Sequence, residues 1–232
     1  MTTNASTVKP YKGMGMNGAV ARWYASLTKR SMDDFTALAR RTAEQIPADA
    51  SVLEVAPGPG YFAIELAKLG NYQITGLDIS ETFVAIARAN AQKAGVGVDF
   101  RQGSASGMPF ARDSFDFLLC RAAFKNFSQP QRALEEMYRV LKPGGHALIV
   151  DLRRDASMDS INQVVEGMKV GTVNALITKL TFRHMLLKRA YTRREFESMI
   201  AQTRFHAEIC ENRMGVEIIL SKPAGVSALA FF

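Results

Sequence analysis

The chain has 232 residues, 47% of them hydrophobic, which is enough for one well-buried domain and too apolar for a disordered protein. The two cysteines, Cys120 and Cys210, and the three histidines show no zinc-site spacing and no disulfide framework, so no metal is expected. There is no run of roughly 18 apolar residues and no signal-peptide pattern, which predicts a soluble, cytoplasmic protein without a membrane span. The net charge of +7 is attributed to a general basic bias, and a nucleic-acid partner is not expected without a known motif.

Two helices are predicted before the first strand, over residues 17–30 and 32–45. Ser31 is the expected N-cap of the second helix. Asp33 and Asp34 lie in its first turn, where carboxylates favour the positive end of the helix dipole. These helices would form an N-terminal cap over residues 1–50.

Apolar runs alternate with helical patterns between residues 51 and 152, which predicts repeated βα units and a mainly parallel sheet. Ser80 is the expected N-cap of one of these helices, and the turn at Lys142–Gly145 ends another. The expected strands are 51–56, 72–78, 97–102, 114–121 and 145–152, and the expected helices are 61–69, 81–93 and 130–141.

Helical periodicity without strand alternation continues over residues 156–188. A capping box, Thr192 with Glu195, then predicts a helix through residue 201, followed by strands at 205–210 and 215–221. One domain is expected, and the apolar tail from Ala224 is expected to pack in a groove or fray. Its parts would be the cap 1–50, a cofactor-binding core 51–152, a helical substrate cap 153–203, and closing strands and tail 204–232.

The turn Gly58-Pro59-Gly60 lies between a predicted strand and a predicted helix. Glycines let the backbone approach a ligand closely, and the helix N-terminus offers free N–H groups. With Asp78 twenty residues after Gly58, the pattern also fits a dinucleotide fold, so a nicotinamide-dependent oxidoreductase stays an alternative. Glu54 weighs against it, because a carboxylate repels a pyrophosphate and attracts an ammonium group.

Four motifs in order, at residues 53–60, 76–80, 103–116 and 139–145, carry a family resemblance. Over residues 51–152 the chain resembles the class I S-adenosylmethionine-dependent methyltransferases that act on small molecules, related to the ubiquinone/menaquinone-biosynthesis methyltransferases. The resemblance implies a Rossmann-like α/β fold with a seven-stranded, mainly parallel sheet, one antiparallel strand and helices on both faces. It also implies S-adenosylmethionine as the methyl donor and S-adenosylhomocysteine as the product.

The resemblance further implies which residues hold this cofactor. Glu54 would lie near its amino group, Asp78 would accept hydrogen bonds from both ribose hydroxyls, and Ile79 would pack on the adenine. Ala56 replaces the usual first glycine, a change that is tolerated if its φ is negative. Ser104 stands where an aspartate is common. The full implied set is Glu54, Ala56, Gly58, Gly60, Asp78, Ile79, Ser104, Ala105, Arg121 and Tyr24.

The methyl acceptor is less well defined by the sequence. Transfer from a sulfonium is an in-line displacement that positioning accelerates, and no catalytic base is identified. Relatives often have histidines after the fourth strand, where Lys125 and Asn126 stand here. The candidates for acceptor contact are Trp23, Phe124, Lys125, Asp151, Arg153 and Tyr191.

The leading prediction is methyl transfer to O, N or C of a small apolar or aromatic metabolite. The alternatives are an RNA or protein methyltransferase that uses the basic stretch from Arg183 to Arg194, the oxidoreductase, and a cofactor-binding protein without transfer activity. A small-molecule acceptor is the expected partner, and a homodimer is possible.

Overall fold

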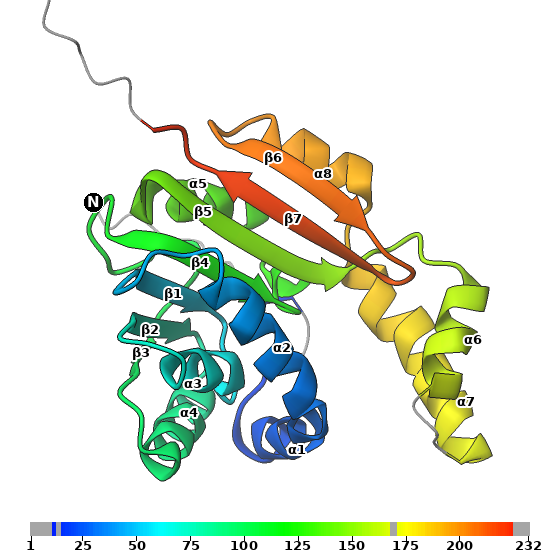
Figure 1. Cartoon of the computed structure of the whole chain (residues 1–232). Helices are drawn as coiled ribbons and strands as arrows, with labels where there is room; N and C mark the ends of the chain where they lie inside the picture. The colour runs from blue at the N-terminus through cyan, green and yellow to red at the C-terminus, as the bar shows by residue number, and fades with distance from the viewer. Residues whose placement is uncertain (1–10, 13–14, 168–170, 225–232) are drawn as a thin grey trace, which may run out of the picture.

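A computed structural model describes residues 11–12, 15–167 and 171–224. Seven strands form one sheet in the order β3-β2-β1-β4-β5-β7-β6, as Figure 1 shows. The first five strands are parallel, and β7 runs antiparallel to both of its neighbours, which confirms the predicted fold class. The strands are β1 (Ser51–Val55), β2 (Gln73–Asp78), β3 (Asp99–Gln102), β4 (Phe115–Arg121), β5 (Leu141–Leu152), β6 (His206–Glu211) and β7 (Gly215–Ser221).

Helices cover both faces of the sheet (Figure 1). The α-helices are α1 (Gly18–Thr28), α2 (Met32–Ala43), α3 (Tyr61–Ala67), α4 (Glu81–Ala94), α5 (Pro130–Val140), α6 (Met158–Gly167), α7 (Thr172–Thr181) and α8 (Arg193–Ile200). Four short helical turns join them: η1 (Lys29–Ser31), η2 (Phe124–Asn126), η3 (Phe182–Leu186) and η4 (Leu187–Arg189).

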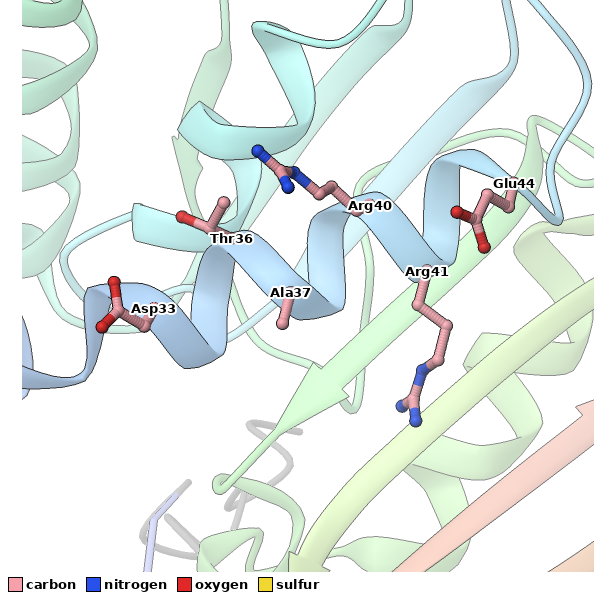
Figure 2. Close-up of a pocket in the computed structure, with 6 residues that line it drawn as sticks. All are labelled: Asp33, Thr36, Ala37, Arg40, Arg41 and Glu44. Carbon is pink, nitrogen blue, oxygen red and sulfur yellow. The ribbon is translucent and has the colours of Figure 1, made fainter.

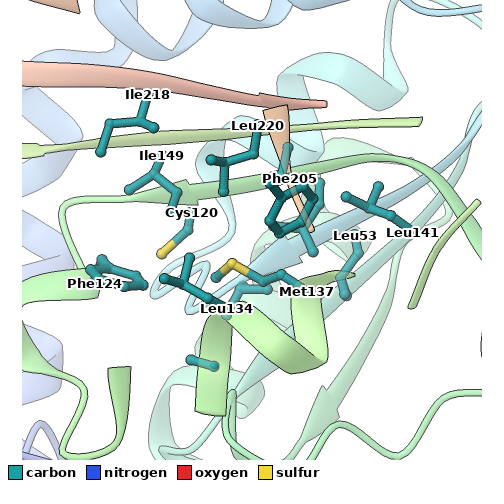
Figure 3. Close-up of a cluster of buried hydrophobic side chains, with 14 of the residues drawn as sticks. Leu53, Cys120, Phe124, Leu134, Met137, Leu141, Ile149, Phe205, Ile218 and Leu220 are labelled. Carbon is teal, nitrogen blue, oxygen red and sulfur yellow. The ribbon is translucent and has the colours of Figure 1, made fainter. Parts of the chain in front are cut away.

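Alternation along the strands divides the core into two layers. Val52 belongs to a cluster with side chains of α2, α3 and α4, whereas Leu53 belongs to a second cluster with side chains of α5 and α8. Figure 3 shows the second cluster, in which Leu134 and Met137 of α5 meet Ile218 and Leu220 of β7. The sheet is therefore buried on both faces, as a parallel α/β sheet requires.

Several local predictions are confirmed and others are wrong in detail. The Ser80 hydroxyl accepts from Phe83 N, and the capping box of Thr192 is complete. Ser31 precedes α2 but makes no capping hydrogen bond with its side chain. β5 begins at Leu141, earlier than expected, because Leu141 already pairs with Phe115 across the ladder.

The long helical pattern over residues 156–188 is broken into α6, α7, η3 and η4, a segment we call the α6–α7 arm. Glycines at 167 and 171 flank the break, and glycine is a weak helix former. A small cluster with Ile161, Val165 and Leu187 joins the arm's helices and includes Met214, which lies between β6 and β7. Beyond this cluster the arm extends away from the sheet (Figure 1).

None of the helices in the described part of the chain combines the length and apolarity that crossing a bilayer requires. The predicted apolar tail lies outside the described residues, except for Ala224.

Candidate functional site

The strand order places the candidate site. β1 lies between β2 and β4. From β1 the strands β2 and β3 are added on one side of the sheet, and β4 and β5 are then added on the other side, so the strand order reverses at β1. In such sheets the crevice for a ligand opens at the carboxyl ends of the strands on either side of this switch point. The loops after β1, β2, β3 and β4 meet at this edge.

The loop after β1 has a backbone that only certain residues adopt easily. Gly58 and Gly60 have φ values of +55° and +77°. A Cβ at Gly60 would come within 2.6 Å of the Phe100 ring, so both conformation and packing require glycine there. A Cβ at Gly58 would lie 4.0 Å from the Phe83 ring, an ordinary van der Waals contact, so at this position the positive φ alone favours glycine.

Ala56 also has a positive φ, +56°, so the condition under which alanine would be tolerated there without strain is not met. Its N–H donates to the carbonyl of Leu77 at 2.8 Å, which fixes the point where the chain leaves β1. A left-handed conformation costs a residue with a Cβ roughly 1–2 kcal/mol. The site thus carries a local strain that a glycine at this position would relieve.

Asp78 ends β2 and is buried beside the loop. One carboxylate oxygen accepts from Gly58 N at 3.0 Å and the other from Ser80 N at 2.8 Å. Burial raises the pKa of the Asp78 carboxyl above its ordinary value, and the N–H donors of Ser80 and Gly58 act in the opposite direction. The carboxylate is therefore held in one orientation beside the loop after β1.

Glu54 is buried inside the same edge, on β1. One of its oxygens accepts from Ala63 N, in the first turn of α3, at 3.1 Å, and the other has no hydrogen bond to any described residue. Burial raises the pKa of Glu54 to about 8, although the Ala63 N–H and the Arg121 guanidinium lower it. One carboxyl oxygen thus accepts a hydrogen bond at the N-terminus of α3, and the other oxygen is free to bind a ligand.

The loop after β3 lies against Asp78, because Gly103 N donates to the Asp78 carbonyl at 2.9 Å. Ser104 accepts from Ser106 N at 3.2 Å, and Ala105 packs against the core. Ile79 is half-buried on the other side of Asp78. The structure therefore brings these candidates together with Asp78.

Arg121 is the last residue of β4, and Tyr24 of α1 lies near enough to be influenced by its charge. The Arg121 guanidinium stacks 4.4 Å from the centre of the Phe35 ring, and Tyr24 packs edge-on against Phe83 at 5.9 Å. Burial raises the pKa of Tyr24, while the charge of Arg121 lowers it. Tyr24 is therefore a neutral phenol, able to donate a hydrogen bond.

Among the acceptor candidates, Lys125 and Asp151 form a buried ion pair of 2.7 Å. Asp151 lies inside β5 and also accepts from Lys125 N and Leu152 N. The Lys125 ammonium is tied further to the Ala122 carbonyl at 2.6 Å, so it is fully engaged within the protein.

Three other acceptor candidates lie either in the hydrophobic core or at the surface. Phe124 is completely buried in the core, in contact with the ring of Tyr191. Arg153 pairs with Asp155 and Glu211 at the surface. Trp23 is 64% exposed and faces solvent, unlike its neighbour Tyr24.

The segment before α1 contacts the candidate site, although nothing in the sequence predicted a role for it. Lys12 N donates to Asn126 O at 2.7 Å, and the Lys12 ammonium donates to the Tyr191 hydroxyl at 2.6 Å. At the other end of the segment, Ser80 donates to Met16 O. This N-terminal strap, residues 11–12 and 15–18, thus runs from the β4 side of the edge to the start of α4. No periodicity marked it, because its contacts are all long-range.

Tyr11 of the strap lies among the charged groups of the site. Burial raises the pKa of Tyr11 to about 12; the positive charge of Arg189 opposes this shift, and the nearby Tyr24, Asp78 and Asp151 add to it. Tyr11 is therefore, like Tyr24, a buried neutral phenol.

A separate groove of about 500 Å³ runs along α2, lined by Asp33, Thr36, Ala37, Arg40, Arg41 and Glu44 (Figure 2). Arg41 points toward the sheet, where it pairs with Glu217 of β7 at 3.1 Å. No residue of the candidate site lines this groove. The described residues also contain no group of three or more potential metal-binding side chains.

The donor and acceptor pattern fits S-adenosylmethionine. The free oxygen of Glu54 suits a cationic amino group, and Asp78, the one carboxylate at the end of β2, suits a sugar diol. A pyrophosphate would instead face two acidic side chains.

Comparison with known proteins agrees with this geometry. Residues 53–149 match the family described as "Methyltransferase domain". The chain is 32% identical over 135 residues to a demethylmenaquinone methyltransferase of Chlorobaculum parvum, covering 57% of this chain and 54% of that protein. It is 31% identical over 139 residues to a ubiquinone/menaquinone biosynthesis C-methyltransferase of Roseobacter denitrificans, covering 59% and 52%. The chain thus spans about half the length of these curated relatives.

Among solved structures, the fold is similar to that of a putative S-adenosylmethionine-dependent methyltransferase from Methanococcus maripaludis, with a TM-score of 0.70. The match covers 91% of this chain and 96% of the other at 20% identity. Residues 53–149 accordingly match a methyltransferase family, and the chain is similar to methyltransferases of ubiquinone and menaquinone biosynthesis over somewhat more than half of its length.

Proposed function

We propose that the protein transfers a methyl group from S-adenosylmethionine to a small aromatic acceptor with oxygen substituents, of the hydroquinone kind. The observation that carries this proposal is Asp78, buried at the end of β2 and oriented by Gly58 N and Ser80 N. The relatives that act on demethylmenaquinone support the choice of acceptor class.

The roles of the chain's residues in holding the cofactor follow from the site. Glu54 would neutralise the amino group, Asp78 would accept from the ribose hydroxyls, and Ile79 with Ala105 would flank the adenine. When bound, the cofactor supplies a methyl group already activated by the positive sulfur. The protein's task is then to orient the acceptor and exclude water.

The acceptor side has the donors that an oxygen-bearing ring requires. Tyr11 and Tyr24 stay neutral because burial raises the pKa of both, so they donate hydrogen bonds and do not act as bases. Arg121 adds a positive charge that would stabilise a phenolate or enolate form of the acceptor. Lys125 is held by Asp151 and is unsuited to proton removal.

The test is an assay of S-adenosylhomocysteine release with a reduced naphthoquinone as acceptor, its oxidised form as control, and mass spectrometry of the product. We expect release with the reduced acceptor and its loss in Asp78→Asn. Equal release from the wild type and from Asp78→Asn, or none from either, would contradict the proposal.

A further inference from the structure

The positive charge of the chain is concentrated in two segments without any acidic residue, residues 1–32 and 167–194. Together they contain 12 of the 29 Lys and Arg residues and none of the 22 Asp and Glu residues. The rest of the chain therefore has a net charge of −5, so the overall +7 arises from these segments alone. Their described parts form the strap with α1, and α7 with the turns that follow it.

The same two segments expose large apolar side chains at helical spacing. Trp23 and Leu27 on α1 are 64% and 44% exposed, and Leu176 and Leu180 on α7 are 60% and 49% exposed. Residues four apart share a helix face, so each helix presents an apolar pair to solvent. In Figure 1, α1 and the α6–α7 arm both extend toward the lower edge of the view, away from β6.

A groove of about 320 Å³ lies at the base of the arm and combines both features. Its apolar wall includes Met158, Ile161 and Leu187, and its cations are Arg154, Arg183 and Lys188. Arg183 and Lys188 are exposed and form no ion pair with a described residue. A lipid phosphate with the first part of its acyl chain has the matching chemistry.

We propose that α1 and the α6–α7 arm dock the protein on the surface of an anionic lipid bilayer. Exposed Trp and Leu side chains beside Lys and Arg are what an interfacial helix uses to enter the headgroup region of anionic lipids. RNA would gain nothing from paired leucines, and a second copy of the same acid-free surface would be repelled. The inference stands apart from the proposed reaction, since binding requires no methyl donor.

The test uses the full-length protein with vesicles of phosphatidylcholine alone or mixed with phosphatidylglycerol. Trp23 is the chain's single tryptophan, so a blue shift of its fluorescence reports its own entry into the lipid. We expect the shift and co-sedimentation only with phosphatidylglycerol, and a decrease of both with added salt.

Two double variants separate the apolar from the charged contribution. Leu176→Ser with Leu180→Ser should weaken binding about tenfold, and Arg183→Gln with Lys188→Gln about 25-fold. The matched controls, Leu69→Ser and Lys93→Gln with Arg112→Gln, change exposed residues outside both segments and should bind as the wild type does.

Three results would overturn the proposal. The first is equal binding to both kinds of vesicle, or to neither. The second is a salt-dependent shift of RNA without vesicle binding, which would assign the basic segments to nucleic acid. The third is a dimer in sedimentation velocity that Leu176→Ser with Leu180→Ser dissociates, which would assign the apolar pairs to self-association.

Discussion

Glu54→Gln should stabilise the free protein and make its stability depend less on pH. In the folded protein burial raises the pKa of Glu54 from 4.5 to about 8. Between these two values the folded state holds a proton that the unfolded state has lost. The free energy of unfolding of the wild type therefore falls as pH rises through this window.

The size of the effect follows from the shift. Between pH 5 and pH 7.5 the wild type should lose about 3 kcal/mol at this site, at about 1.4 kcal/mol per pH unit with partial titration at both ends. The glutamine side chain can still accept from Ala63 N but does not titrate. The variant should thus be more stable than the wild type at pH 7.5, by a melting-temperature difference of about 6–12 °C.

The assay is urea unfolding of wild type and Glu54→Gln at both pH values, without ligand. Glu208→Gln, at an exposed position on β6, is the matched control and should follow the wild type at both pH values. If the difference between Glu54→Gln and the wild type were the same at pH 5 and pH 7.5, Glu54 would not be a buried group with a raised pKa and the reasoning would be refuted.

Asp78→Asn should weaken binding of S-adenosylhomocysteine about 10- to 150-fold, because a charged acceptor contributes roughly 1.5–3 kcal/mol per hydrogen bond; an unchanged calorimetric Kd would remove Asp78 from the site. Ala56→Gly should raise the free energy of unfolding by up to about 1 kcal/mol by relieving the left-handed strain, whereas Ala85→Gly on an exposed face of α4 should lower it by about 1 kcal/mol. Lys125→Met should cost about 3–5 kcal/mol by leaving Asp151 buried without its partner. Adding Asp151→Asn, which removes the charge and keeps one oxygen to accept from the backbone, should recover part of that loss in urea unfolding; a double variant less stable than Lys125→Met would contradict a buried ion pair.

Most of the sheet was predictable because its strands and the helix caps beside them have local causes in the sequence. The strands of the βα units are continuous apolar runs, and the caps at Ser80 and Thr192 are short-range hydrogen bonds. The break of the arm after residue 167 was missed, since helical periodicity continues across two glycines that only weaken a helix. The early start of β5 depends on pairing with Phe115, which is a long-range contact.

In the candidate site, too, the features with a local cause were predictable, and those that depend on backbone conformation or long-range contacts were not. Asp78 and Gly58 stand at strand ends, where chain order alone places them at one edge of the sheet. The positive φ of Ala56 could not be read from the residue type, which favours the opposite sign. Tyr11 reaches the site through the contacts of Lys12 with Asn126 and Tyr191, which no local pattern encodes.

Calorimetric titration of the wild-type protein with S-adenosylhomocysteine and, separately, with NADH tests the assignment of the methyl donor. We expect saturable binding of S-adenosylhomocysteine, weakened in Asp78→Asn, and no heat of binding with NADH. Binding of NADH without binding of S-adenosylhomocysteine would contradict this assignment.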